Sequence, residues 1–166
     1  TFLQYLKTGD TILDVGCGSG RDSLYFKKCG YKVTAFDASI EMVNRSTKLL
    51  GQKVIHSTFE DFHTTDFFDG IWACASLLHV KRNQVSSVVR KLGATLKPAG
   101  IFYLSFKYGD GEFTTEDRYF NCYNEQTFLH FVKELPDLQL VTISKTRDVR
   151  PERTNEYWLN CYLRKQ

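Results

Sequence analysis

The chain has 166 residues, of which 42% are hydrophobic and 25% charged, and its formal net charge is +3. This length fits one ordinary domain, so we expect residues 1–166 to form a single domain. The small basic excess does not favour nucleic acid as a partner, and no apolar run is long enough to span a membrane. The five cysteines are widely spaced without a C-x-x-C pair, which predicts reduced thiols, a cytoplasmic location and no zinc site.

Along the first two thirds of the chain, apolar runs of strand length alternate with segments of helical period. The runs that predict strands are residues 11–15, 32–37, 53–57, 68–75 and 101–108. The segments that predict helices are residues 21–29, 39–50 and 81–97, with boundary signals at Gly30, Ser39, Gly51 and Pro98. Residues 1–7 look like the end of a helix. This alternation predicts a parallel sheet with helices on both faces, because parallel strands need long crossover connections.

The last third of the chain has a different pattern. A loop is expected at residues 109–117, followed by a helix at 124–135 that Asn124 opens and that ends before Pro136. Two strands are expected at 138–146 and 156–165, joined by a basic turn. Consecutive strands joined by a turn pair antiparallel.

A glycine-rich turn connects the first predicted strand to the first helix in "ILDVGCGSGRDSLYF", residues 12–26. Gly16 permits a sharp turn, Gly18 lets a ligand approach the main chain, and Gly20 lets the helix begin close to the sheet. The G-x-G-x-G spacing is neither a dinucleotide fingerprint nor a phosphate loop. Asp14 would repel a pyrophosphate and would suit a ligand that carries an ammonium and a sulfonium. The turn therefore predicts a nucleoside-containing cofactor.

Asp37 ends the second predicted strand. A carboxylate at this place can accept two hydrogen bonds from the vicinal hydroxyls of a ribose. The alternative is that Asp37 only caps the helix that follows.

The segment "ILDVGCGSGRDSLYFKKCGYKVTAFDAS" resembles the first two motifs of class I S-adenosylmethionine-dependent methyltransferases, and most of all the branch that contains the tellurite-resistance methyltransferase. The resemblance extends through residues 59–80 and 96–109. It implies an α/β, Rossmann-like doubly wound sheet of seven mostly parallel strands, in the order 3-2-1-4-5-7-6 with strand 7 antiparallel. It also implies S-adenosylmethionine as cofactor, no metal, and N-terminal helices that are truncated here to residues 1–7.

The resemblance further implies a set of site residues. Those expected to bind the cofactor are Asp14, Gly16, Cys17, Gly18, Gly20, Arg21, Asp37, Ala38, Met42, Thr58, Phe59, Glu60, Cys74 and Leu77. The adenine amino group would meet Thr58, Glu60 or Asp61, and Leu78 would join Cys74 and Leu77 beside the methyl group. Cys17 and Cys74 are expected to be small buried residues, since methyl transfer needs no enzyme nucleophile.

The acceptor side is predicted from residues that follow the fourth and fifth strands. His79 could orient or deprotonate an acceptor, or could be a surface histidine. Lys107, Tyr108, Arg118 and Tyr119 are the expected substrate-binding residues. Arg147, Arg150, Arg153 and Tyr123 would lie near them, and a solvated charged face is the alternative.

The sequence therefore predicts a methyltransferase, expected as a monomer or weak dimer, that acts on a small molecule. No N/D-P-P-Y/F/W stretch follows the fourth strand and no Pro-Cys pair is present, which argues against nucleobase methylation. Methylation of RNA or protein and a non-catalytic cofactor-binding subunit remain open, and a nicotinamide oxidoreductase is the alternative cofactor class.

Overall fold

The computed structural model describes residues 1–115 and 118–166, and its first half follows the predicted alternation of strands and helices. In chain order the elements are η1 (Phe2–Tyr5), β1 (Thr11–Val15), α1 (Arg21–Lys28), β2 (Lys32–Asp37), α2 (Ile40–Leu50), β3 (Ile55–His56), β4 (Phe68–Ala73), η2 (Leu77–His79) and α3 (Arg82–Ala94). The remaining elements are β5 (Leu96–Tyr108), β6 (Gly111–Thr115), β7 (Arg118–Tyr123), α4 (Glu125–Val132), β8 (Leu138–Arg147), η3 (Pro151–Arg153) and β9 (Tyr157–Lys165).

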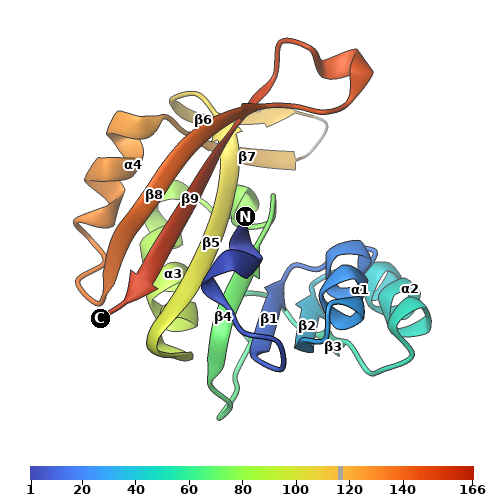
Figure 1. Cartoon of the computed structure of the whole chain (residues 1–166). Helices are drawn as coiled ribbons and strands as arrows, with labels where there is room; N and C mark the ends of the chain where they lie inside the picture. The colour runs from blue at the N-terminus through green and yellow to red at the C-terminus, as the bar shows by residue number, and fades with distance from the viewer. Residues whose placement is uncertain (116–117) are drawn as a thin grey trace.

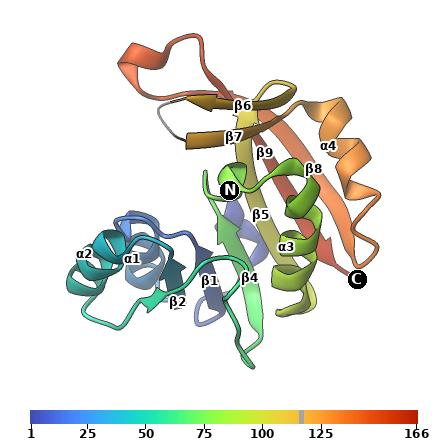
Figure 2. The same cartoon turned by 180° about the vertical axis from the view of Figure 1, so that it is seen from behind.

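The strand order confirms the expected fold. Strands β3, β2, β1, β4 and β5 are parallel neighbours in that order. Strand β9 then pairs antiparallel with β5, and β8 pairs antiparallel with β9. Because β8 and β9 are the sixth and seventh predicted strands, this path is the expected order 3-2-1-4-5-7-6 with the seventh strand antiparallel. Helices α3 and α4 cover one face of the sheet, which Figure 2 shows from the front, and η1 lies on the other face (Figure 1).

A hairpin replaces most of the loop that we predicted at residues 109–117. Strands β6 and β7 pair antiparallel from Gly111 and Cys122 to Thr115 and Arg118, and the end of β5 pairs with β7, so that the sheet has nine strands. The loop prediction is therefore wrong for residues 111–115, and residues 116–117 lie outside the described part of the chain.

The hairpin is attached to α3 by Arg82. The guanidinium donates to Asn121 Oδ1 at 2.9 Å and to the carbonyls of Gly111 and Cys122, and it lies 4.2 Å from the centre of the Tyr123 ring. These partners are 29 to 41 positions away in the chain, so no local pattern in residues 109–117 could reveal the hairpin.

Most helix ends follow the local capping signals, but α3 and α4 each end three residues before the predicted end, α4 at Val132 and not at Leu135. The Ser39 hydroxyl accepts from the Met42 amide, Gly51 is left-handed, and Asn124 forms a capping box with Thr127. By contrast, α3 ends at Ala94 and not near Lys97 as predicted. Residue 96 already pairs with β4, and this long-range pairing decides where the helix stops.

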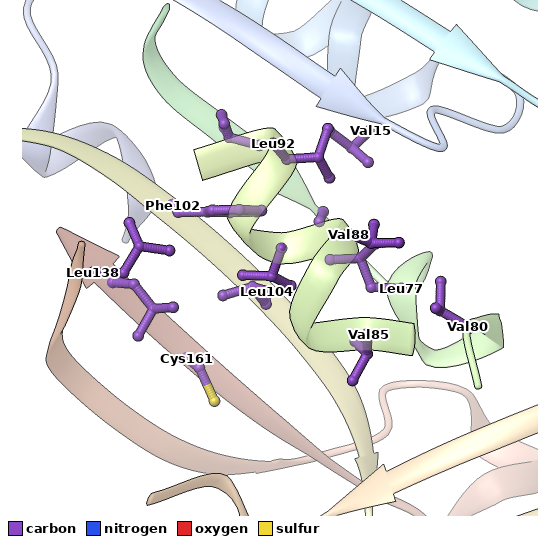
Figure 3. Packing of buried hydrophobic residues seen from close by; sticks show 14 of the residues in the cluster. Val15, Leu77, Val80, Val85, Val88, Leu92, Phe102, Leu104, Leu138 and Cys161 are labelled. Carbon is purple, nitrogen blue, oxygen red and sulfur yellow. The ribbon is translucent and has the colours of Figure 1, made fainter. Parts of the chain in front are cut away.

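The largest core lies between the sheet and helices α3 and α4. Val85, Val88 and Leu92 of α3 pack against Phe102 and Leu104 of β5, and all five are at most 4% exposed (Figure 3). A second cluster, built around Phe2, Phe26 and Trp72, lies under η1 and α1 on the opposite face. The packing on both faces fixes the carboxyl ends of the parallel strands, where ligands bind in open α/β sheets. No helix in the described ranges has the length and apolar content needed to cross a bilayer.

Candidate functional site

In the glycine turn after β1, only Gly18 could carry a Cβ atom without contacting another part of the protein. All three glycines have positive φ angles, +69° at Gly16, +53° at Gly18 and +81° at Gly20. A Cβ on Gly16 would lie 2.6 Å from Ser76 Cβ, and one on Gly20 would lie 2.9 Å from Ser46 Cβ. A Cβ on Gly18 would meet nothing within 4 Å, so the space over this residue is open. Gly18 is therefore the position where a ligand can reach the backbone.

Gly20 allows close packing at the start of α1, and the neighbour that it meets there is Ser46 of α2. Contact of Gly20 with a cofactor stays a prediction. Gly16 brings the turn against residue 76, which follows β4. The Phe59 ring approaches the same point, 3.8 Å from the position of a Cβ on Gly16.

Asp37 links the glycine turn to the start of α2. Its Oδ2 accepts from the Gly18 amide at 2.8 Å and its Oδ1 accepts from the Ser39 amide at 2.9 Å. Asp37 therefore supports the start of α2, as one alternative expected, and it also lies beside Gly18, whereas its contact with a ribose stays a prediction. Each carboxylate oxygen retains a second acceptor position, which leaves capacity for two ligand hydroxyls.

Asp14 is a buried carboxyl at the end of β1. It is 2% exposed and accepts a hydrogen bond of 2.6 Å from the Ser23 hydroxyl. Burial raises the pKa of Asp14 to about 7 in spite of this hydrogen bond, and the charges of Asp22 and Asp37 act in the same direction as burial. A cation bound nearby would restore the ionised form.

The raised pKa of Asp14 predicts a pH-dependent cost in stability. The unfolded chain loses this proton near pH 4 and the folded chain near pH 7, so the contribution of Asp14 to stability falls as pH rises between these values and is then constant. We expect Asp14→Asn to melt about 10 °C above the parent at pH 8, with the difference shrinking as pH falls toward 4. Thermal melts of both proteins across this range measure it, with Asp66→Asn as a surface control. A difference independent of pH would contradict the assignment.

Several of the residues predicted to contact the adenine form hydrogen bonds within the protein. Thr58 and Asp61 satisfy each other in a turn, because the Thr58 hydroxyl donates to Asp61 Oδ2 at 2.8 Å and accepts from the Asp61 amide. The Ala38 carbonyl contacts the His56 ring at 3.0 Å. Met42 is half-buried in the first turn of α2, and Glu60 is exposed. Contacts of these residues with a ligand stay a prediction.

A pocket of about 710 Å³ adjoins the glycine turn. Cys74 and Ala75 line the pocket, and the next residue, Ser76, is the one that touches Gly16. Other lining residues come from β5, from the β6–β7 hairpin and from the loop between β8 and β9, which lie at the same end of the sheet (Figure 1). The site therefore has two connected parts, an open backbone turn with Asp37 beside it and a pocket beyond it.

A family model described as a methyltransferase domain matches residues 12–100, more than half of the chain. The chain belongs to this family. The match and the strand order confirm the expected class I S-adenosylmethionine-dependent methyltransferase fold and family, whereas the tellurite-resistance branch stays a prediction.

Known proteins similar to this methyltransferase domain differ in what they do. The chain is 28% identical over 109 residues to (S)-coclaurine N-methyltransferase of Papaver somniferum, covering 60% of this chain and 30% of that protein. It spans less than half the length of the curated relatives that it matches.

Solved structures show the same fold at low identity. The 1,6-didemethyltoxoflavin-N1-methyltransferase of Burkholderia thailandensis, solved with 1,6-didemethyltoxoflavin and S-adenosylhomocysteine, has a TM-score of 0.84 and 21% identity, covering 99% of this chain and 75% of that one. The [4+2]-cyclase SpnF has a TM-score of 0.77 and 17% identity, covering 99% and 79%. The fold alone therefore does not decide the reaction.

The pocket of the methyltransferase domain contains half of the predicted substrate residues. Lys107 and Arg118 line it, but Tyr108 and Tyr119 do not. Tyr108 donates its hydroxyl to Glu125, and the Tyr119 hydroxyl accepts from the Arg82 amide at 3.0 Å. Successive strand residues point to opposite faces, which is why each tyrosine points away from the pocket that its basic neighbour lines.

Of the predicted site residues that follow β4, some line the pocket and one is buried in the core. Cys74, Leu78 and His79 line the pocket, as does Arg21, whose Nε donates to Asp22 at 2.9 Å. The side chain of Leu77 is fully buried in the core beside α3 and is not among the residues that line the pocket (Figure 3), so its contact with the methyl group stays a prediction.

Both predicted thiols stay protonated. Burial raises the pKa of Cys74 to about 11 and that of Cys17 to about 12. Neutral thiols are poor nucleophiles, which agrees with a reaction that needs no covalent enzyme intermediate.

Sequence reasoning missed the contribution of the last strand to the pocket. Trp158 and Asn160 of β9 line it, together with Asp148 and Glu156 of the preceding loop. The alternation of residues 158 and 160 along β9 is the signal that could have placed them on one face.

Proposed function

We propose that residues 1–166 act as one domain that transfers the methyl group of S-adenosylmethionine to a small-molecule acceptor. The supporting observation is that Gly16 of the glycine turn lies against Ser76, and that the two residues before Ser76 line the pocket. The open position over Gly18 and the pocket are therefore near each other. A volume of about 710 Å³ is within the range of small-molecule sites.

The residues fit the cofactor in the manner the family implies. S-Adenosylmethionine supplies a methyl group on a sulfonium, which is already an activated leaving group. Asp37 offers two acceptor positions for the ribose, and the bare backbone at Gly18 allows close approach. The buried Asp14 carboxyl adds negative charge near the positively charged end. The chain's main task is alignment, and holding two reactants in line can supply about 7 to 11 kcal/mol of the barrier.

His79 is the proposed proton acceptor for the incoming substrate. Its Nδ1 lies 2.8 Å from the Tyr119 carbonyl, which can only accept, so Nδ1 carries the proton and Nε2 keeps a lone pair. The side chain lines the pocket. A base in this position can remove a proton from an acceptor during methyl transfer.

Replacing His79 with Gln tests this role. We expect kcat to fall about 100-fold, with little change in the KM for S-adenosylmethionine, because proton removal is lost while the cofactor contacts remain. Steady-state kinetics with the acceptor found below measure the effect, and His63→Gln in the exposed connection before β4 is the control. His79 is exposed at the pocket, and an unchanged kcat would show that it takes no part in proton removal.

The proposed function is tested by transfer of labelled methyl groups. The chain is incubated with S-adenosylmethionine labelled in the methyl group, and with pooled metabolites, total RNA or total protein in separate reactions. The proposal expects label in the low-molecular-weight fraction. Label in RNA or protein would favour a macromolecular acceptor, and binding of the cofactor without any transfer would favour a non-catalytic subunit.

A further inference from the structure

The acceptor pocket has a surplus of positive charge. Its basic lining residues are Arg21, Lys107, Arg118, Arg147, Arg150 and Arg153. Among the residues that the structure describes, 1–115 and 118–166, its acidic lining residues are Asp148 and Glu156. The basic residues come from separate elements, namely the start of α1, the end of β5, the β6–β7 hairpin and the end of β8 with its loop, so folding gathers the charge at one place.

The two carboxylates are engaged in shaping the β8–β9 loop. Asp148 accepts from Arg150 Nε at 2.9 Å and Nη2 at 2.5 Å, and from the indole of Trp158 at 2.9 Å. Glu156 pairs with Lys107 at 3.0 Å and with Arg153 at 3.3 Å. The Arg150 guanidinium holds the pKa of Asp148 below its usual range, and Lys107 lowers the pKa of Glu156. Both acids are therefore ionised, and their two negative charges offset two of the three positive charges of Lys107, Arg150 and Arg153.

Arg118 and Arg147 contribute most of the positive charge that remains. In residues 1–115 and 118–166 neither has a salt-bridge partner, and both are exposed. Arg147 donates its Nε to the Thr154 carbonyl at 2.5 Å, which fixes the side chain and leaves the terminal nitrogens available. Guanidinium groups bind carboxylates and phosphates through two parallel hydrogen bonds.

Flat aromatic surfaces accompany these cations. Trp158, whose indole is tied to Asp148, and Tyr103, which stacks on Trp72 with a centroid distance of 4.0 Å, both line the pocket. The Phe120 ring also lines it and stacks on Phe113 with an interplanar angle of 16°. Rings held in fixed orientations favour a planar ligand.

We propose that the methyl acceptor is a planar organic anion, whose carboxylate or phosphate group is bound by Arg147 and Arg118. This inference rests on the proposed function, because it assigns the substrate class of the same pocket. It goes beyond a small-molecule acceptor by naming the charge and the residues that select it.

Binding of matched ligands tests the proposal. The chain is first saturated with S-adenosylhomocysteine, and 4-hydroxybenzoate, phenyl phosphate and the neutral 4-hydroxybenzamide are then titrated by calorimetry. We expect one of the two anions to bind at least about tenfold more tightly than the amide, and the better anion identifies the group as carboxylate or phosphate. The preference should decrease as salt concentration rises.

Substitution of the two arginines tests whether they cause the preference for an anion over the neutral amide. Arg147→Gln and Arg118→Gln should each reduce the preference for the anion several-fold, whereas Arg90→Gln on the exposed face of α3 should leave it unchanged. The proposal is overturned if the amide binds as tightly as the anions, if neither anion binds, or if both variants keep the full preference. Failure of S-adenosylhomocysteine to bind in the first step would instead reject the proposed function.

Discussion

Replacing Asp37 with Asn is expected to weaken the binding of S-adenosylhomocysteine at least about 100-fold. The carboxylate holds the Gly18 amide at 2.8 Å and the Ser39 amide at 2.9 Å through different oxygens. An Asn side chain can accept only one of these hydrogen bonds, because its NH₂ group would face the other amide donor. The ribose would lose a charged acceptor, and the glycine turn would lose the contact that orients it.

Calorimetric titration of parent and variant measures this effect. Asp66→Asn removes the same charge from an exposed part of the connection before β4 and should leave affinity unchanged. We expect Asp37→Asn to remain folded, with a loss in stability of about 1 to 3 kcal/mol. Unchanged affinity in a folded Asp37→Asn protein would mean that Asp37 only supports the start of α2.

Substitution of Gly18 by Ala is expected to abolish cofactor binding while leaving the fold intact. No atom lies within 4 Å of the added methyl group, so the stability cost is that of the left-handed backbone alone, about 1 to 2 kcal/mol. The methyl group would occupy the space through which the cofactor approaches the main chain.

Two other glycines provide matched controls for this prediction. Gly51 has a φ of +60° and equally open surroundings at the end of α2, so Gly51→Ala should cost similar stability and keep full affinity. Gly16→Ala would put a methyl group 2.6 Å from Ser76 Cβ and should lower stability by about 3 kcal/mol or more. Thermal melts and calorimetry of the three variants separate packing from ligand access. Normal cofactor affinity in Gly18→Ala would show that the ligand does not pass over this residue.

The parts of the fold that sequence reasoning predicts well are those set by local interactions. Ser39, Gly51 and Asn124 mark helix ends through contacts with residues three or four positions away. The parallel strands follow from apolar runs separated by helices, and the antiparallel pair β8–β9 follows from a short connection.

The parts that it misses depend on contacts between distant segments. The β6–β7 hairpin is joined to α3 through Arg82, and α3 stops at Ala94 because β5 begins to pair at Leu96. In the site, the sequence indicates that Gly18 and Asp37 belong together, and the 2.8 Å hydrogen bond joins them. It does not indicate that the neighbour of Gly20 is Ser46 of α2 or that Trp158 reaches the pocket, because both depend on which face of an element meets its neighbour.

The most direct test of the central claim is calorimetric titration of the unmodified chain with S-adenosylhomocysteine and, separately, with NAD. We predict one-to-one binding of S-adenosylhomocysteine and no binding of NAD, because the open Gly18 position and Asp37 can hold the adenosine that both ligands share, while Asp14 disfavours the pyrophosphate that only NAD carries. Binding of NAD without binding of S-adenosylhomocysteine would contradict it.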